Sequence, residues 1–98
     1  MSEAKFQARL LQDLRKFENG WFYKASDKYV VGIPDILGCV NGRMVAIECK
    51  AENGRVSKIQ EHVLSEISAA GGYAFLANPN NKDEVLAKIK ELNSPKDK

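Results

Sequence analysis

Apolar residues recur every three or four positions in three stretches of the 98-residue chain, a spacing that predicts amphipathic helices. The first helix is predicted to begin after the capping residue Ser2 and to end before Gly20. The second is predicted over residues 58–70, and the third after a cap formed by Asn81 and Glu84. Their inward-facing positions are predicted to be Phe6, Leu10, Leu11, Leu14 and Phe17, then Ile59, Val63, Leu64 and Ile67, and finally Val85, Leu86, Ile89 and Leu92.

Between these helices, short runs of aromatic and β-branched residues predict strands. One covers residues 21–25, and the entirely apolar run at residues 73–77 is predicted to be a buried strand. Two more runs flank Asn41-Gly42, a pair that favours a two-residue type I′ turn because both residues tolerate positive φ. Residues 33–50 are therefore predicted to form a β-hairpin.

The hairpin register determines which side chains meet across the two strands. With Asn41 and Gly42 as the loop, Val40 pairs with Arg43, Cys39 pairs with Met44, and Asp35 lies opposite Glu48. Opposed Cβ atoms are roughly 5 Å apart, so two like charges would repel unless a cation lies between them. Hard cations such as Mg²⁺ or Mn²⁺ favour carboxylate ligands. The register thus predicts a metal site, with Lys50 beside Glu48 on the same face.

A strand, a helix and a strand following the hairpin imply a right-handed crossover and parallel pairing of the last strand with the second hairpin strand. The predicted order is α-β-β-β-α-β-α, an α/β fold with one mixed sheet flanked by helices. The length fits a single domain over residues 1–92, followed by a frayed tail at residues 93–98.

Composition excludes several classes of protein. The net charge of +2 permits nucleic-acid binding without demanding it. No apolar run approaches the roughly 18 residues of a membrane span, and no signal peptide is evident, which indicates a cytoplasmic protein. Cys39 and Cys49 fall on opposite faces of the hairpin, so we expect no disulfide. Only His62 could add to them as a zinc ligand, which predicts two reduced cysteines packed in the sheet.

The site residues belong to a longer pattern: Gly32-x-Pro34-Asp35, Ile47-Glu48-Cys49-Lys50 and Ser57-x-x-Gln60. Pro-Asp followed by Glu-x-Lys matches the PD-(D/E)xK motif, and the whole pattern resembles the VRR-NUC nucleases, which are similar in turn to archaeal Holliday junction resolvases. The resemblance spans residues 3–75. It is to the minimal, stand-alone members of viral or phage type, for which the compartment would be the host cytoplasm.

This resemblance implies a restriction-endonuclease-like core and an Mg²⁺-dependent endodeoxyribonuclease, with Mn²⁺ as a substitute and no organic cofactor. Asp35, Glu48 and the backbone carbonyl of Cys49 would hold the metal, and Lys50 would act on the nucleophilic water or the transition state. Four-way junctions are the leading substrate and other branched DNA the next. A homodimer would bring two sites to two strands.

Two further site residues have structural explanations as well. Glu3 shares the inward stripe of the first helix, and in the resolvase-like nucleases a glutamate there completes the acidic site; it is also an ordinary first-turn glutamate favoured by the helix dipole. Gln60 forms a capping box with Ser57, whereas the resemblance places it beside the catalytic lysine. Contacts with the phosphate backbone are predicted for Lys24, Ser26, Lys28, Arg55 and Lys58.

Two alternative functions stay open. The chain could be a non-catalytic DNA-binding or assembly module, although Asp35, Glu48 and Lys50 are all present. It could also be a nuclease acting on flaps or on other nucleic acids, including RNA, because phosphate contacts do not read the sugar. For a dimer interface, the sequence suggests only apolar residues expected at the surface, namely Tyr29, Val30, Val31 and Leu92.

Overall fold

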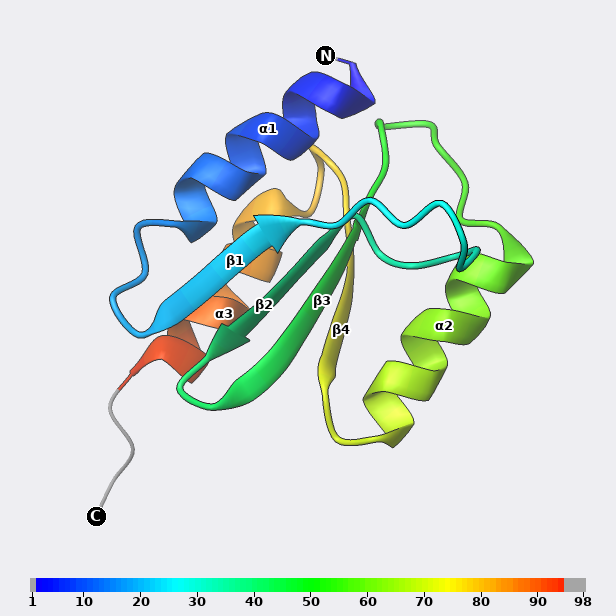
Figure 1. Cartoon of the computed structure of the whole chain (residues 1–98). Coiled ribbons are helices and arrows are strands. Elements are labelled where there is room, and N and C mark those ends of the chain that lie inside the picture. The colour runs from blue at the N-terminus through cyan, green and yellow to red at the C-terminus, as the bar shows by residue number, and fades with distance from the viewer. Residues whose placement is uncertain (1, 95–98) are drawn as a thin grey trace.

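The protein is an α/β structure of three helices and one four-stranded sheet, seen in a computed structural model that describes residues 2–94 (Figure 1). The predicted order α-β-β-β-α-β-α is confirmed. In chain order, the elements are α1 (Glu3–Leu14), β1 (Gly20–Lys24), β2 (Ile36–Val40), β3 (Arg43–Cys49), α2 (Lys58–Ala69), β4 (Tyr73–Ala77) and α3 (Lys82–Asn93).

The sheet is mixed, as predicted, with the strand order β1-β2-β3-β4. β1 and β2 pair antiparallel, β2 and β3 form the antiparallel hairpin, and β3 pairs parallel with β4 through the connecting helix α2. Because the strands follow the chain order, β1 and β4 are the two edges of the sheet.

The hairpin turn adopts the conformation that its sequence demands. Asn41 has φ of 50° and Gly42 has φ of 80°, as a type I′ turn requires. Val40 pairs with Arg43 and Cys39 with Met44, so the predicted register is confirmed. The Asn41 side-chain nitrogen also donates to the backbone oxygens of Leu92 (2.7 Å) and Ser94 (2.9 Å), which fixes the turn to the end of α3.

Helix caps follow the sequence in two of three cases. The Ser2 side chain accepts a hydrogen bond from the Lys5 amide, and Ser57 forms the predicted capping box. Asn81 holds the N-cap position of α3, as predicted, but its side chain makes no capping hydrogen bond. The Asn81 side chain instead accepts from the Asn78 amide and donates to the Leu76 carbonyl, each at 2.8 Å, so it stabilises the preceding loop.

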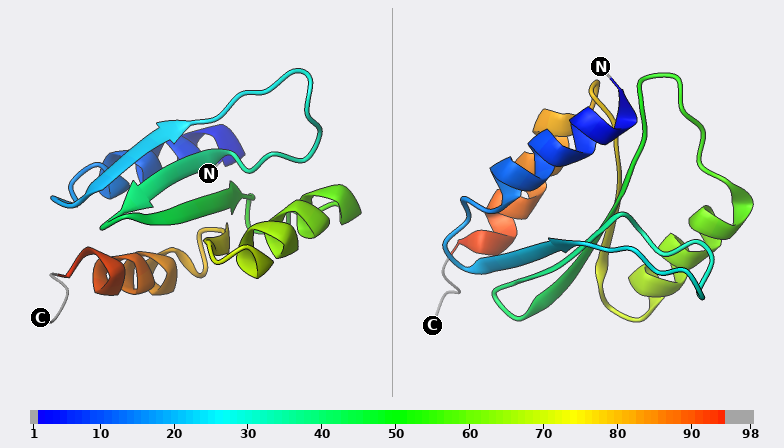
Figure 2. Two further views of the ribbon diagram at one scale, coloured as in Figure 1. Left: turned by 60° about the horizontal axis from the view of Figure 1, so that its bottom comes forward. Right: turned by 45° about the horizontal axis from the view of Figure 1, so that its top comes forward.

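One face of the sheet carries the hydrophobic core. α1 and α3 lie side by side over this face (Figures 1 and 2). Gly38 permits the close packing there, because a Cβ at this position would lie 2.3 Å from Phe22 Cδ1. The buried cluster comprises Phe6, Leu10, Leu11, Leu14, Phe22, Ile36, Val40, Val45, Ile47, Cys49, Ala77, Val85 and Ile89.

The opposite face is only partly covered, by α2, and two predictions of burial fail there. No residue of α2 is buried, and Ile59 on its predicted inner face is 44% exposed. A groove of about 480 Å³, lined by Leu37, Met44, Val63 and Ile67 among others, separates α2 from the sheet. The prediction that β4 is a buried strand is also wrong, because it is an edge strand in which only Ala77 is buried.

The C-terminal boundary differs from the prediction as well. Asn93, expected to begin a frayed tail, is the last residue of α3, and its side chain accepts a hydrogen bond from the Asn19 amide at 2.9 Å. Leu92, suggested for an interface, packs half-buried against the core. Residues 95–98 of the predicted tail lie outside the described residues. Across residues 2–94, no helix is long and apolar enough to cross a membrane.

Candidate active site

The candidate site lies at the end of the sheet where β1, β3 and β4 end and β2 begins. The Ala25 amide donates to the Asp35 backbone oxygen (2.7 Å), which extends the pairing of β1 with β2 by one residue. The Lys50 amide donates to the Ala77 backbone oxygen (2.9 Å), which likewise extends the pairing of β3 with β4. Backbone hydrogen bonds therefore fix the main chain of both Asp35 and Lys50.

Asp35 and Glu48 form the centre of this site. The last β2–β3 pair is Ile36 with Ile47, so Asp35 and Glu48 are the next residues in register, as predicted. Asp35 lies one residue before β2, and its Oδ2 accepts a hydrogen bond from the Cys49 amide at 2.8 Å. The carboxylate thereby replaces a backbone acceptor of the β2–β3 ladder as the partner of the Cys49 amide, and this hydrogen bond holds it against β3.

Glu48 is almost fully buried, with 2% of its surface exposed. Its Oε1 has no hydrogen-bond partner among the described residues. Burial, and then the nearby Asp35 carboxylate, raise the pKa of Glu48 to about 7. An unpaired, buried carboxylate oxygen is costly unless something positive lies against it.

Lys50 supplies part of that positive charge. Its Nζ lies 3.3 Å from Glu48 Oε2, and its side chain is only 14% exposed. When all three groups are ionised, the two carboxylates outnumber the single ammonium, and the site keeps one net negative charge. The pair with Lys50 therefore leaves both a free charge and the free oxygen Oε1.

Cys49 contributes its backbone rather than its thiol. The side chain lies in the hydrophobic core, on the opposite face from Glu48, and burial raises the pKa of the thiol to about 12. The thiol is therefore neutral at ordinary pH, in agreement with a packed, reduced cysteine. Cys39 differs from that prediction, because its thiol is free but exposed. A metal contact of the Cys49 carbonyl stays a prediction.

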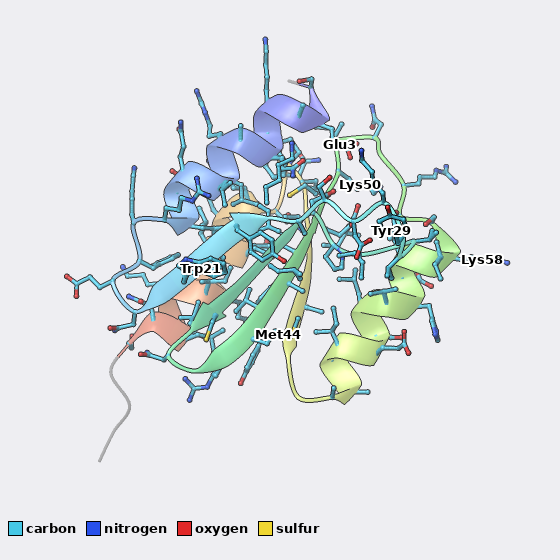
Figure 3. The ribbon with its side chains drawn as sticks, in the orientation of Figure 1. Glu3, Trp21, Tyr29, Met44, Lys50 and Lys58 are labelled. Atoms are coloured by element: carbon cyan, nitrogen blue, oxygen red, sulfur yellow. The ribbon has the colours of Figure 1, made fainter. Side chains whose placement is uncertain are left out.

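Glu3 lies at the start of α1, exposed, at the same end of the sheet as Lys50 (Figure 3). Within residues 2–94, no three His, Cys, Asp or Glu side chains gather closely enough to hold a metal ion. The structure thus brings Asp35 and Glu48 together as a pair and leaves Glu3 outside it. The role of Glu3 in completing the acidic site stays a prediction.

Gln60 is engaged in the helix cap. Its Oε1 accepts from the Ser57 amide at 2.9 Å, while the Ser57 hydroxyl accepts from the Gln60 amide at 3.2 Å. The structural explanation of this residue is confirmed, and its catalytic role stays a prediction.

The residues predicted to contact phosphate are all exposed, and they come from three segments of the chain. Lys24 ends β1, and Ser26 and Lys28 follow in the segment that leads to Asp35. Arg55 and Lys58 lie just before and at the start of α2, where Lys58 points outward (Figure 3). Their contacts with nucleic acid stay predictions.

The sequence interpretation missed two exposed aromatic residues on the face of the sheet that carries the site. Trp21 and Tyr23 are 64% and 41% exposed on β1, and their ring centroids are 5.2 Å apart. The residue between them, Phe22, is buried in the core. The alternation Trp-Phe-Tyr was the available signal, since it places one aromatic inside and two on the opposite face of the same strand.

The site fits a divalent cation on its own chemistry. Mg²⁺ is commonly bound by one or two protein carboxylates, with water and substrate phosphate completing the octahedron. Asp35 and Glu48 supply those carboxylates, and the unpartnered Oε1 of Glu48 is an oxygen that lacks a donor. No family model and no curated protein matches the chain.

Proposed function

We propose that this protein is a metal-dependent endonuclease of the VRR-NUC type, with a restriction-endonuclease-like core, that cuts branched DNA. The observation that carries the proposal is the buried, unpartnered Oε1 of Glu48, opposite Asp35 and beside Lys50. The register, the motif Pro34-Asp35…Glu48-x-Lys50 and the charge balance all support the same chemistry.

Asp35 and Glu48 are the proposed ligands of Mg²⁺, together with the Cys49 carbonyl. A bound divalent cation would neutralise charge on the scissile phosphate and lower the pKa of a coordinated water. The contribution of the chain is to hold both carboxylates rigidly, because Asp35 is tied to the Cys49 amide and Glu48 is enclosed by β3 and its neighbours. Mn²⁺ would substitute, since it favours the same oxygen ligands.

Lys50 is the proposed catalytic cation. Its Nζ is held 3.3 Å from Glu48 Oε2, with little exposure to solvent, and so its position is defined before substrate binds. An ammonium at this point can orient the attacking water or stabilise the charge that develops on the phosphate oxygens. Both roles require the short distance to the carboxylate.

Four-way junctions are the first substrate to test, and a homodimer is the proposed assembly, because two copies would present two sites to two strands. The exposed basic residues Lys24, Lys28, Arg55 and Lys58 support binding of a phosphate backbone. Flaps and other branched duplexes are the next substrates.

The test is cleavage of labelled four-way junction, flap, linear duplex and single-stranded DNA with Mg²⁺, Mn²⁺ or EDTA. The Lys50→Ala variant is compared with wild type and with Lys88→Ala, which removes an exposed lysine on α3 instead. We expect metal-dependent cutting of branched DNA that falls by about 10²- to 10³-fold in Lys50→Ala, with no change in Lys88→Ala.

Tight binding of junctions without cutting in either metal would overturn the proposal and favour the non-catalytic module. Cutting of RNA in preference to DNA would keep the chemistry and change the substrate. Thermal unfolding of each variant shows whether a loss of activity reflects the site or a loss of fold.

A further inference from the structure

We propose that the uncovered face of β1 and β2 is a binding platform for unpaired nucleotides, with Trp21 and Tyr23 stacking on two successive bases. The inference deepens the proposed nuclease function and rests on it, since it names the substrate class: DNA with a single-stranded segment beside the cut. Fully paired junctions would then be poorer substrates than flaps or gapped branches.

The platform is the side of the sheet that the helices leave open. α1 and α3 cover the other side, and α2 covers part of β3 and β4 with a groove between it and Leu37 of β2, so the side chains on this face of β1 are open to solvent in front (Figures 1 and 2). Figure 3 shows Trp21 on this open part of the sheet, at the end of β1 away from Lys50. Two large aromatic surfaces are thus exposed without a covering element.

The platform and the candidate site share one face. Tyr23 pairs with Leu37, two residues along the chain from Asp35, and Trp21 pairs with Cys39, four residues from Asp35. At about 3.3 Å per residue, Tyr23 lies roughly 7 Å and Trp21 roughly 13 Å along the sheet from the carboxylate pair. A strand of nucleic acid with one phosphate at the site would place its next two bases over these rings.

The chemistry of the platform suits bases better than it suits charged partners. Every base has a π-face, so exposed aromatics on a sheet bind single strands without reading sequence. Between Trp21 and the site, the open-face positions of β1, β2 and β3 carry no acidic side chain until Asp35 and Glu48.

A second copy of the chain is the competing occupant, because an exposed apolar face can also be a dimer interface. Continuity with the site favours the nucleotide: the two rings lie in line with Asp35 on one face, which a dimer contact does not require. Base stacking and self-association predict different results in two measurements, and neither measurement requires cleavage of DNA.

The first measurement uses the fluorescence of Trp21, the only tryptophan in the chain. Oligothymidylate is titrated in EDTA against wild type, with a blunt hairpin duplex for comparison. We expect quenching by the single strand that the duplex reproduces only weakly. In Tyr23→Leu, the affinity for oligothymidylate should fall by at least about fivefold, since each stacked base contributes roughly that much or more.

Tyr73→Leu is the matched control. Tyr73 is 40% exposed, almost the same as Tyr23 at 41%, but it lies on the opposite edge strand β4. Its replacement should leave the affinity for oligothymidylate unchanged. An equal loss in both variants would overturn the proposal, because a general loss of surface aromatics or of stability would then explain the effect.

The second measurement uses Cys39, which is exposed and pairs with Trp21, whereas Cys49 is buried. A maleimide should therefore label Cys39 alone, and oligothymidylate should slow this labelling severalfold. Labelling that slows with rising protein concentration instead, with no effect of the oligonucleotide, would assign the face to a second copy and overturn the proposal.

These outcomes are distinguishable from failure of the proposed function. Metal-dependent cutting of fully paired junctions, with Trp21 unquenched and Cys39 unprotected, would remove the platform and leave the nuclease. Quenching and protection in a protein that cuts nothing would retain the single-strand surface and remove the catalytic roles of Asp35, Glu48 and Lys50.

Discussion

The two faces of the sheet differ in what they bury. Under α1 and α3, β3 contributes Val45 and Ile47, fully buried among other apolar side chains. On the other face, the same strand contributes Met44, which is 44% exposed, and the buried, charged Glu48. Neighbouring residues of β3 therefore have opposite effects on stability: Val45 and Ile47 stabilise the fold, whereas burial of Glu48 destabilises it.

This difference indicates a division of labour between the faces. Burial of apolar surface on the closed face stabilises the chain. The open face carries an ionisable pair that burial makes unfavourable, together with exposed aromatics that no element covers. Groups that destabilise a fold without an evident structural role are expected at binding or catalytic sites.

The largest effect should come from Glu48→Gln, which keeps the shape of the side chain and removes its charge. We expect metal-dependent cleavage to fall by at least about a thousandfold, because a proposed ligand worth several kcal/mol in the transition state is lost. In EDTA at pH 8, the variant should be no less stable than wild type, since a neutral amide avoids burying a second carboxylate beside Asp35. Cleavage rates measure the loss of activity, and melting temperatures measure the stability.

A melting temperature of Glu48→Gln well below that of wild type, by more than about 5 °C, would contradict the division between the faces. Glu48 would then be a structural residue whose pair with Lys50 stabilises the fold.

The next largest effect is a difference in stability between side-chain truncations on the two faces of β3. Ile47→Ala should lower the free energy of unfolding by about 2–5 kcal/mol, because it opens a cavity in the core. Met44→Ala should lower it by less than about 1 kcal/mol, because that side chain is already half exposed. Urea denaturation of both variants measures the difference. Equal losses would mean that the open face is covered in solution.

The smallest effect is the pH dependence of stability without metal. Burial raises the pKa of Glu48 from 4.5 to about 7, so between these values the folded state binds more protons than the unfolded state. Stability therefore falls as pH rises through this window, by at most about 3 kcal/mol. The difference between wild type and Glu48→Gln in EDTA isolates this contribution.

Mg²⁺ extends the same experiment, because a carboxylate must be ionised to bind it. Added Mg²⁺ should raise the melting temperature of wild type more at pH 8 than at pH 6, and should leave Glu48→Gln unchanged. A rise of the same size in both proteins would place the ion elsewhere.

Local signals in the sequence determined much of the site. Asn41-Gly42 favours a type I′ turn, and this turn sets the register that puts Asp35 opposite Glu48. Alternation with a period of two then placed Lys50 beside Glu48, and the structure finds them 3.3 Å apart. These features depend on neighbours within one hairpin, so short-range geometry is sufficient to predict them.

The tertiary structure decided how far each face is covered. The apolar residues of α2 and β4 have the spacing of core positions in sequence. Most of them stay partly exposed, because a groove lies between α2 and the sheet and because β4 is an edge strand. For the same reason, the alternation in Trp21-Phe22-Tyr23 predicts that Trp21 and Tyr23 share a face but not that this face remains open to solvent. Periodicity tells which side of a strand is apolar, whereas burial depends on which element packs against that side, and that is a property of the whole fold.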